Sequence, residues 1–153
     1  MKAEKRKKDI QKSLVQMMFE VMSPAKTSDN PTEELRDYWK YATSPEVKEF
    51  YSTEKTGKWC IFVNPKSIDK AWKAVKLSCA QGKLLVAKCS TAKSSGTPKY
   101  PKYIICVYNE DWQDSAEVQR VREELKNIGF TKPLKYKRDI ETINGVYGVG
   151  EYF

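Results

Sequence analysis

The chain has 153 residues, the usual length of one domain and enough to bury a single core. Its 28 Lys and Arg residues outnumber the 20 Asp and Glu residues, so the formal charge is +8 and polyanionic partners are favoured, although lysine-rich surfaces also serve solubility alone. No histidine is present, which excludes zinc sites built on Cys and His and catalysis that uses histidine as general acid or base.

The first 22 residues predict an amphipathic helix with a basic start. A cluster of four cations at residues 5–8 precedes apolar residues at helical spacing, namely Ile10, Leu14, Met17, Met18 and Val21. Three uses remain open for this helix: packing onto the domain, docking on a protein partner, or touching an anionic surface such as RNA or lipid.

No apolar run of the sequence approaches the length that spans a bilayer, and the first residues lack the uninterrupted apolar core of a signal peptide. We therefore expect no transmembrane segment and a cytoplasmic or nuclear location.

Residues 23–32 are rich in Pro, Ser, Asp and Asn and predict a linker. Residues 33–51 carry aromatic and aliphatic side chains among many charges. We expect one short helix before Ser44 and Pro45 and another after them, with Pro45 in its first turn. Residues 33–153 are expected to form a single α+β domain.

The segment 58–63 is rich in aromatic and β-branched residues and stops at an Asn-Pro pair, as a strand does. Ser67 is placed to cap a helix that Gly82 ends, and residues 83–89 predict a second strand. The helix should pack on the sheet through four residues spaced at four, three and four: Ile68, Trp72, Val75 and Cys79.

A basic loop over residues 90–102 follows, and then a strand over 103–108 whose apolar character on both faces predicts a central position. Asp114 and Glu117 form an acidic variant of the capping box for a helix that Gly129 stops. Residues 133–138 alternate like a half-buried strand, and three glycines between 145 and 150 indicate a turn-rich end.

The four cysteines have no CxxC spacing, and three of them lie inside the strand-like runs. We predict that they are reduced core residues and hold no metal. They are Cys60, Cys79, Cys89 and Cys106.

The order strand, helix, strand, basic loop, strand, helix, strand resembles the second half of the messenger-RNA cap-binding initiation factors. The matching segments are residues 57–61, the pair Asp69 and Trp72, residues 103–108 and residues 118–129. The resemblance implies a curved, mainly antiparallel sheet that surrounds its ligand, with helices on its convex face.

A closer resemblance is to the family of basophilic leukaemia-expressed protein, some members of which are labelled phosphothreonine-lyase-like. It rests on residues 57–62, 87–91, 136–140 and 145–147. The family implies the same fold. A lyase reaction would need Lys88 as its base and, without histidine, a substitute acid such as Tyr108.

Lys88 is the leading candidate for ligand binding, because its alternation with Val86 places a lysine on an apolar sheet face. Such a lysine invites an anion, unless it lies at a sheet edge or pairs with a carboxylate such as Glu110. Ser90 and Thr91 offer hydroxyl groups directly after it. Basic residues that complete the predicted rim are Lys93, Lys99, Lys102, Lys135, Lys137 and Arg138, and the resemblance adds Tyr108 at an aromatic position.

Together these observations predict non-catalytic binding of a phosphate-bearing ligand, a nucleotide or RNA, on a basic concave sheet face, with no cofactor. One alternative is an enzyme that acts on a phosphorylated peptide or nucleotide in the same pocket. The other is a protein-protein adaptor that uses the N-terminal helix.

Overall fold

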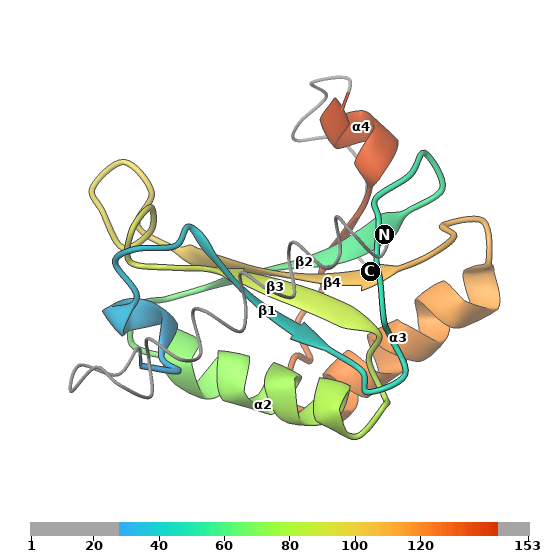
Figure 1. Cartoon of the computed structure of the whole chain (residues 1–153), viewed down its shortest axis with the longest axis horizontal. Helices are drawn as coiled ribbons and strands as arrows, with labels where there is room; N and C mark the ends of the chain where they lie inside the picture. The colour runs from blue at the N-terminus through green and yellow to red at the C-terminus, as the bar shows by residue number, and fades with distance from the viewer. Residues whose placement is uncertain (1–27, 144–153) are drawn as a thin grey trace, which may run out of the picture.

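The computed structural model describes residues 28–143 (Figure 1). The predicted helix over residues 1–22, the first half of the linker and the glycine-rich end lie outside the described residues. The five strands are β1 (Trp39–Thr43), β2 (Gly57–Val63), β3 (Val86–Ser90), β4 (Tyr103–Asn109) and β5 (Lys135–Arg138). The helices are α2 (Ile68–Ala80), α3 (Ser115–Asn127), α4 (Asp139–Ile143) and the short 3-10 helix η1 (Pro31–Glu33).

The strands form one curved sheet in the order β1-β3-β4-β2-β5, and every neighbouring pair is antiparallel. The fold is therefore α+β, as predicted. The central position predicted for residues 103–108 is confirmed, because β4 is the third of the five strands. Chain order and sheet order differ, so the sheet is built mainly from contacts between distant segments.

Helices α2 and α3 cover the same face of the sheet (Figure 1), where the main core lies. The predicted apolar stripe of α2 is buried there against alternate residues of β2, β3 and β4. Helix α3 begins where its cap was predicted, since the Asp114 side chain accepts a hydrogen bond from the Glu117 amide at 3.2 Å. Trp59 and Trp72 are almost fully buried, and for Trp72 this confirms the predicted packing of the helix on the sheet.

The prediction of two short helices in residues 33–51 is wrong. Residues 39–43 form the edge strand β1, which pairs with β3 in a register that joins Trp39 to Ser90. The pairing continues past the strand, where the Ser44 amide donates to the Leu85 carbonyl at 2.8 Å. The pairing of β1 with β3 therefore determines the conformation of residues 39–43, although the local sequence pattern of this charged segment favours a helix.

All four cysteines are free and buried, which confirms their predicted core positions. Three of them lie in strands and Cys79 lies in α2. Between residues 28 and 143 there is no helix long and apolar enough to cross a membrane.

Candidate functional site

The sheet has a second face, opposite α2 and α3, which we call the open face. Strand register assigns alternate residues to it, and it receives one lysine from β2, one from β3 and two from β5. Lys58 stands opposite Lys137, and Lys135 stands opposite Cys60. Lys88 stands between Tyr41 of β1 and Cys106 of β4.

The five described strands contain no Asp or Glu residue. The lysines of the open face are therefore not balanced by acids from the sheet itself. Lys58 and Lys137 carry like charges at directly opposite positions of neighbouring strands, an arrangement that is unfavourable in itself. The strands of the open face therefore contribute cationic side chains and no anionic ones.

Lys88 is half-buried, and its ammonium group lies 3.9 Å from the centre of the Trp39 ring. Burial lowers the pKa of Lys88 below its ordinary value. The predicted alternatives do not hold: β3 is not an edge strand, and no carboxylate within the described residues, Glu110 included, lies within 4.0 Å of this ammonium. Among the described residues, the Lys88 ammonium thus contacts an aromatic ring and not an acid.

Lys58 is held differently, by a carboxylate that follows the last strand. Its ammonium group donates to Asp139 at 2.8 Å, and both residues are buried. Asp139 also accepts a hydrogen bond from Ser52, and its amide donates to the Thr56 carbonyl at 2.8 Å. Asp139 therefore fixes the start of α4 and neutralises the charge of Lys58 on the open face.

Tyr108 lies on the open face beside Lys58, but it is buried under Phe50, whose ring centre is 5.4 Å away. Burial raises the pKa of the Tyr108 phenol far above its ordinary value. The side chain is thus a neutral part of a small second core with Val86 and Cys106.

Two aromatic residues of the edge strand β1 also belong to the open face. Tyr41 is 66% exposed, and Trp39 is half-buried under the Lys88 ammonium. Their register with Lys88 and Ser90 puts both rings on the same side of the sheet as the lysines. An accessible aromatic ring beside cations is what a nucleobase next to its phosphate needs.

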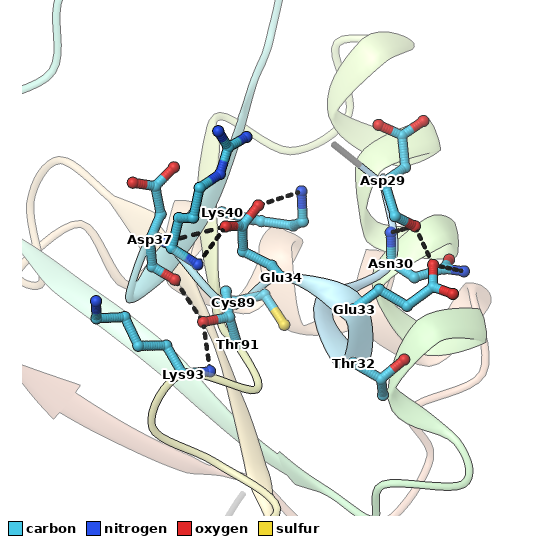
Figure 2. A network of polar contacts seen from close by, with 12 residues as sticks. Asp29, Asn30, Thr32, Glu33, Glu34, Asp37, Lys40, Cys89, Thr91 and Lys93 are labelled. Carbon is cyan, nitrogen blue, oxygen red and sulfur yellow. Dashed lines mark hydrogen bonds and ion pairs between the residues drawn. The ribbon is translucent and has the colours of Figure 1, made fainter. Parts of the chain in front are cut away.

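The predicted hydroxyl groups serve the structure. The Ser90 hydroxyl accepts the Ile104 amide at 2.9 Å and bonds to the Ser95 hydroxyl at 2.8 Å. Thr91 is fully buried, and its hydroxyl donates to the Asp37 carbonyl and accepts the Lys93 amide (Figure 2). Both residues fasten the loop after β3.

Strand register does not assign the other four predicted cations to the open face. Lys93 and Lys99 stack on Tyr38 and Tyr100, which are outside the strands. The Arg138 guanidinium lies 4.7 Å from the centre of the Trp112 ring and pairs with Glu141. The last of the four, Lys102, lines a groove beside β2.

Lys88, Lys135 and Lys137 thus share one face as predicted, whereas Lys58, Trp39 and Tyr41 were missed. Lys58 could have been predicted, because it alternates with the core residue Trp59 in the same strand. No comparable signal exists for the two aromatic residues, because their face depends on pairing with β3.

A family model described as basophilic leukemia-expressed protein Bles03 matches residues 51–143, more than half of the chain. The chain belongs to the Bles03 family. The Bles03 match contains all four lysines of the open face, whereas β1 with its two aromatic residues lies before it.

The fold is also similar to that of solved eIF4E structures. One is Caenorhabditis elegans eIF4E-3 in complex with the 4E-binding protein Mextli and a cap analog, at 11% identity and a TM-score of 0.57, covering 85% of this chain and 77% of that one. Another is schistosome eIF4E complexed with m7GpppA and 4E-BP, at 11% identity and a TM-score of 0.50, covering 63% of this chain and 55% of that one. The chain therefore has an eIF4E-like fold.

Proposed function

We propose that the open face binds a phosphate-bearing ligand, a nucleotide or RNA, without chemical turnover. The observation that carries this proposal is the gathering of Lys58, Lys88, Lys135 and Lys137 on one sheet face whose strands contain no acid. A phosphate would accept charge-assisted hydrogen bonds from Lys88, Lys135 and Lys137, whereas Lys58 stays paired with Asp139.

Lys88 is the expected centre of the site. Its ammonium group is already partly desolvated and lies on the Trp39 ring. An anion that binds there would give the charge a strong partner, and little further desolvation of the lysine would be needed. Tyr41, directly opposite Lys88, would then stack on a base attached to that phosphate.

The width of the sheet supports a ligand longer than free phosphate. Neighbouring strands are about 4.8 Å apart, so Tyr41 on β1 and the two lysines of β5 are separated by roughly 19 Å along the sheet. A short single strand of RNA, or a nucleotide with an extended phosphate chain, matches this distance. Such ligands occur in the cytoplasm and nucleus, the location expected from the sequence.

The solved structures with a similar fold support the same class of ligand. The two eIF4E structures were determined with a cap analog and with m7GpppA, and both of these ligands are nucleotides that carry phosphates. The present chain would use the same kind of curved sheet with its own set of lysines.

Binding is favoured over phosphothreonine-lyase chemistry by the lack of a suitable proton donor. The sequence has no histidine, and burial raises the pKa of Tyr108, the substitute acid, so its phenol holds its proton strongly. Lys88 has a lowered pKa that suits a base, but a base alone does not complete the elimination.

The test is the affinity for a fluorescently labelled single-stranded RNA, measured by anisotropy, and for ATP, measured by tryptophan quenching. Lys88→Ala should weaken RNA binding roughly tenfold, the value of one hydrogen bond between charged groups. The control is Lys70→Ala, which removes the same charge from the exposed side of α2.

The test is completed by the salt dependence of RNA binding and by a search for reaction products. The slope of log affinity against log salt should fall by roughly 0.7 in Lys88→Ala, as for one lost phosphate contact to a single strand. Equal losses in the two variants, or no binding of either anion by the unmodified chain, would contradict the proposal. Release of phosphate from a phosphopeptide would favour the enzymatic alternative.

A further inference from the structure

Two cysteines face each other in the middle of the open face. Cys60 of β2 and Cys106 of β4 are direct partners in the antiparallel register, and both thiols are free. Opposite Cα atoms in antiparallel strands lie about 4.5 or about 5.5 Å apart, depending on the hydrogen-bonding position. Both separations fall within the range of roughly 4.4–6.8 Å that a disulfide spans, so the backbone is already placed for a bond.

We propose that Cys60 and Cys106 form an oxidisable dithiol that closes a cross-strand disulfide between β2 and β4. This modification site is independent of the ligand proposed for the open face, because it rests on the thiol pair alone.

The two thiols have different chemical roles. A hydrogen bond with Cys106 lowers the pKa of Cys60, and the ammonium groups of Lys58 and Lys137 act in the same direction against burial and Asp139. The same thiol-thiol hydrogen bond, together with burial, raises the pKa of Cys106. Cys60 is therefore the thiol of the pair that loses its proton more readily and attacks the oxidant, and Cys106 is the resolving thiol.

Cys60 is buried but borders a groove at the edge of β2. Strand β5 pairs with β2 only as far as Cys60, so the outer edge of β2 is uncovered by β5 from Ile61 onward. A groove of about 590 Å³ lies along this edge and is lined by Cys60, Phe62, Lys102 and Phe130 among others. Hydrogen peroxide is small enough to enter it.

The oxidation balances with hydrogen peroxide as the oxidant. The Cys60 thiolate attacks one peroxide oxygen, so that an S–O bond forms, the O–O bond breaks, and the departing hydroxide takes up a proton as water. Cys106 then attacks the sulfenic sulfur of Cys60, the S–O bond breaks, and the Cys106 proton leaves with the second hydroxide as water. Two thiols and one peroxide thus give one disulfide and two waters.

The other two cysteines provide an internal control. Cys79 and Cys89 face the helix-covered core and are fully buried. Burial raises the pKa of each thiol to about 12, so neither is a thiolate at neutral pH. They should stay reduced under conditions that oxidise the pair.

The experiment is mild peroxide treatment of the folded chain, followed by alkylation, intact mass and peptide mapping. We expect the loss of two hydrogen atoms, a linked peptide pair containing Cys60 and Cys106, and full reversal by dithiothreitol. Cys79→Ser/Cys89→Ser should behave like the unmodified chain, whereas Cys60→Ser should form no disulfide.

Oxidation of Cys79 or Cys89 at the same rate, or a folded chain that forms no Cys60–Cys106 link, would overturn the proposal. If Cys60→Ser does not fold, the peptide map of the unmodified chain and of Cys79→Ser/Cys89→Ser decides the question. Circular dichroism of each protein before treatment establishes that the folded state is being oxidised.

Discussion

Lys58 and Lys88 are lysines on the same sheet face that stabilise their charges in different ways. Lys58 has a buried carboxylate at 2.8 Å, whereas the Lys88 ammonium lies on an aromatic ring. The first arrangement is a structural ion pair, and the second leaves a cation able to accept an anionic ligand. This difference separates the residues that maintain the fold from those expected to bind.

Asp139→Asn should destabilise the fold strongly. It removes the acid next to buried Lys58, which also stands opposite Lys137, so a charge is left buried beside a like charge. Breaking a buried pair in this way costs roughly 3 kcal/mol in the free energy of unfolding. Urea denaturation followed by tryptophan fluorescence measures the change.

Glu123→Gln is the matched control, because it breaks the exposed ion pair with Lys126. Its effect should stay below about 0.5 kcal/mol. Equal stability losses in Asp139→Asn and Glu123→Gln would show that the Lys58–Asp139 pair has no special structural role.

At the scale of elements, β1 depends on the short segment before it. The Glu34 carboxylate accepts the amides of Arg36 and Asp37 at 2.9 and 3.0 Å and pairs with Lys40 of β1 (Figure 2). Burial raises the pKa of Glu34, but the two amides and the Lys40 charge outweigh it and leave the pKa below its ordinary value. This carboxylate therefore helps to hold the edge strand on the sheet.

Glu34→Gln tests that role through pH. Because the folded pKa is the lower one, the stability from Glu34 is fully present above the unfolded pKa of about 4.5 and is lost as pH falls through the folded value. At neutral pH the variant should be less stable by about 1–2 kcal/mol, and the difference should shrink below pH ~4.5. Thermal unfolding across pH measures both effects.

The control for this experiment is Glu54→Gln at an exposed position, which should leave the pH profile unchanged. A difference between Glu34→Gln and the unmodified chain that stays constant from neutral to acidic pH would contradict the assigned role of the Glu34 carboxylate.

Elements that form from local signals were predictable. The spacing of Ile68, Trp72, Val75 and Cys79 and the cap at Asp114 identify α2 and α3 directly. Strand β1 was not predictable in this way, because its side chains find their environment only when β3 lies alongside. The sheet order has the same origin, since distant pairings set it.

At the scale of the whole molecule, one sheet face is covered by helices and the other gathers lysines and the two aromatic residues of β1. Alternation predicted the face of Lys88, Lys135 and Lys137 because it is a property of each strand alone. It did not reveal that the hydroxyls of Ser90 and Thr91 bond within the fold, because those contacts come from other segments.

The most direct measurement of the central claim is a two-dimensional amide NMR titration of the full chain with a short single-stranded RNA. We expect the shifts to concentrate around Tyr41, Lys88, Lys135 and Lys137 on the open face, with the exposed side of α2 unmoved. Shifts centred on Lys70 and Lys73 of α2, or no shifts at all, would contradict the account.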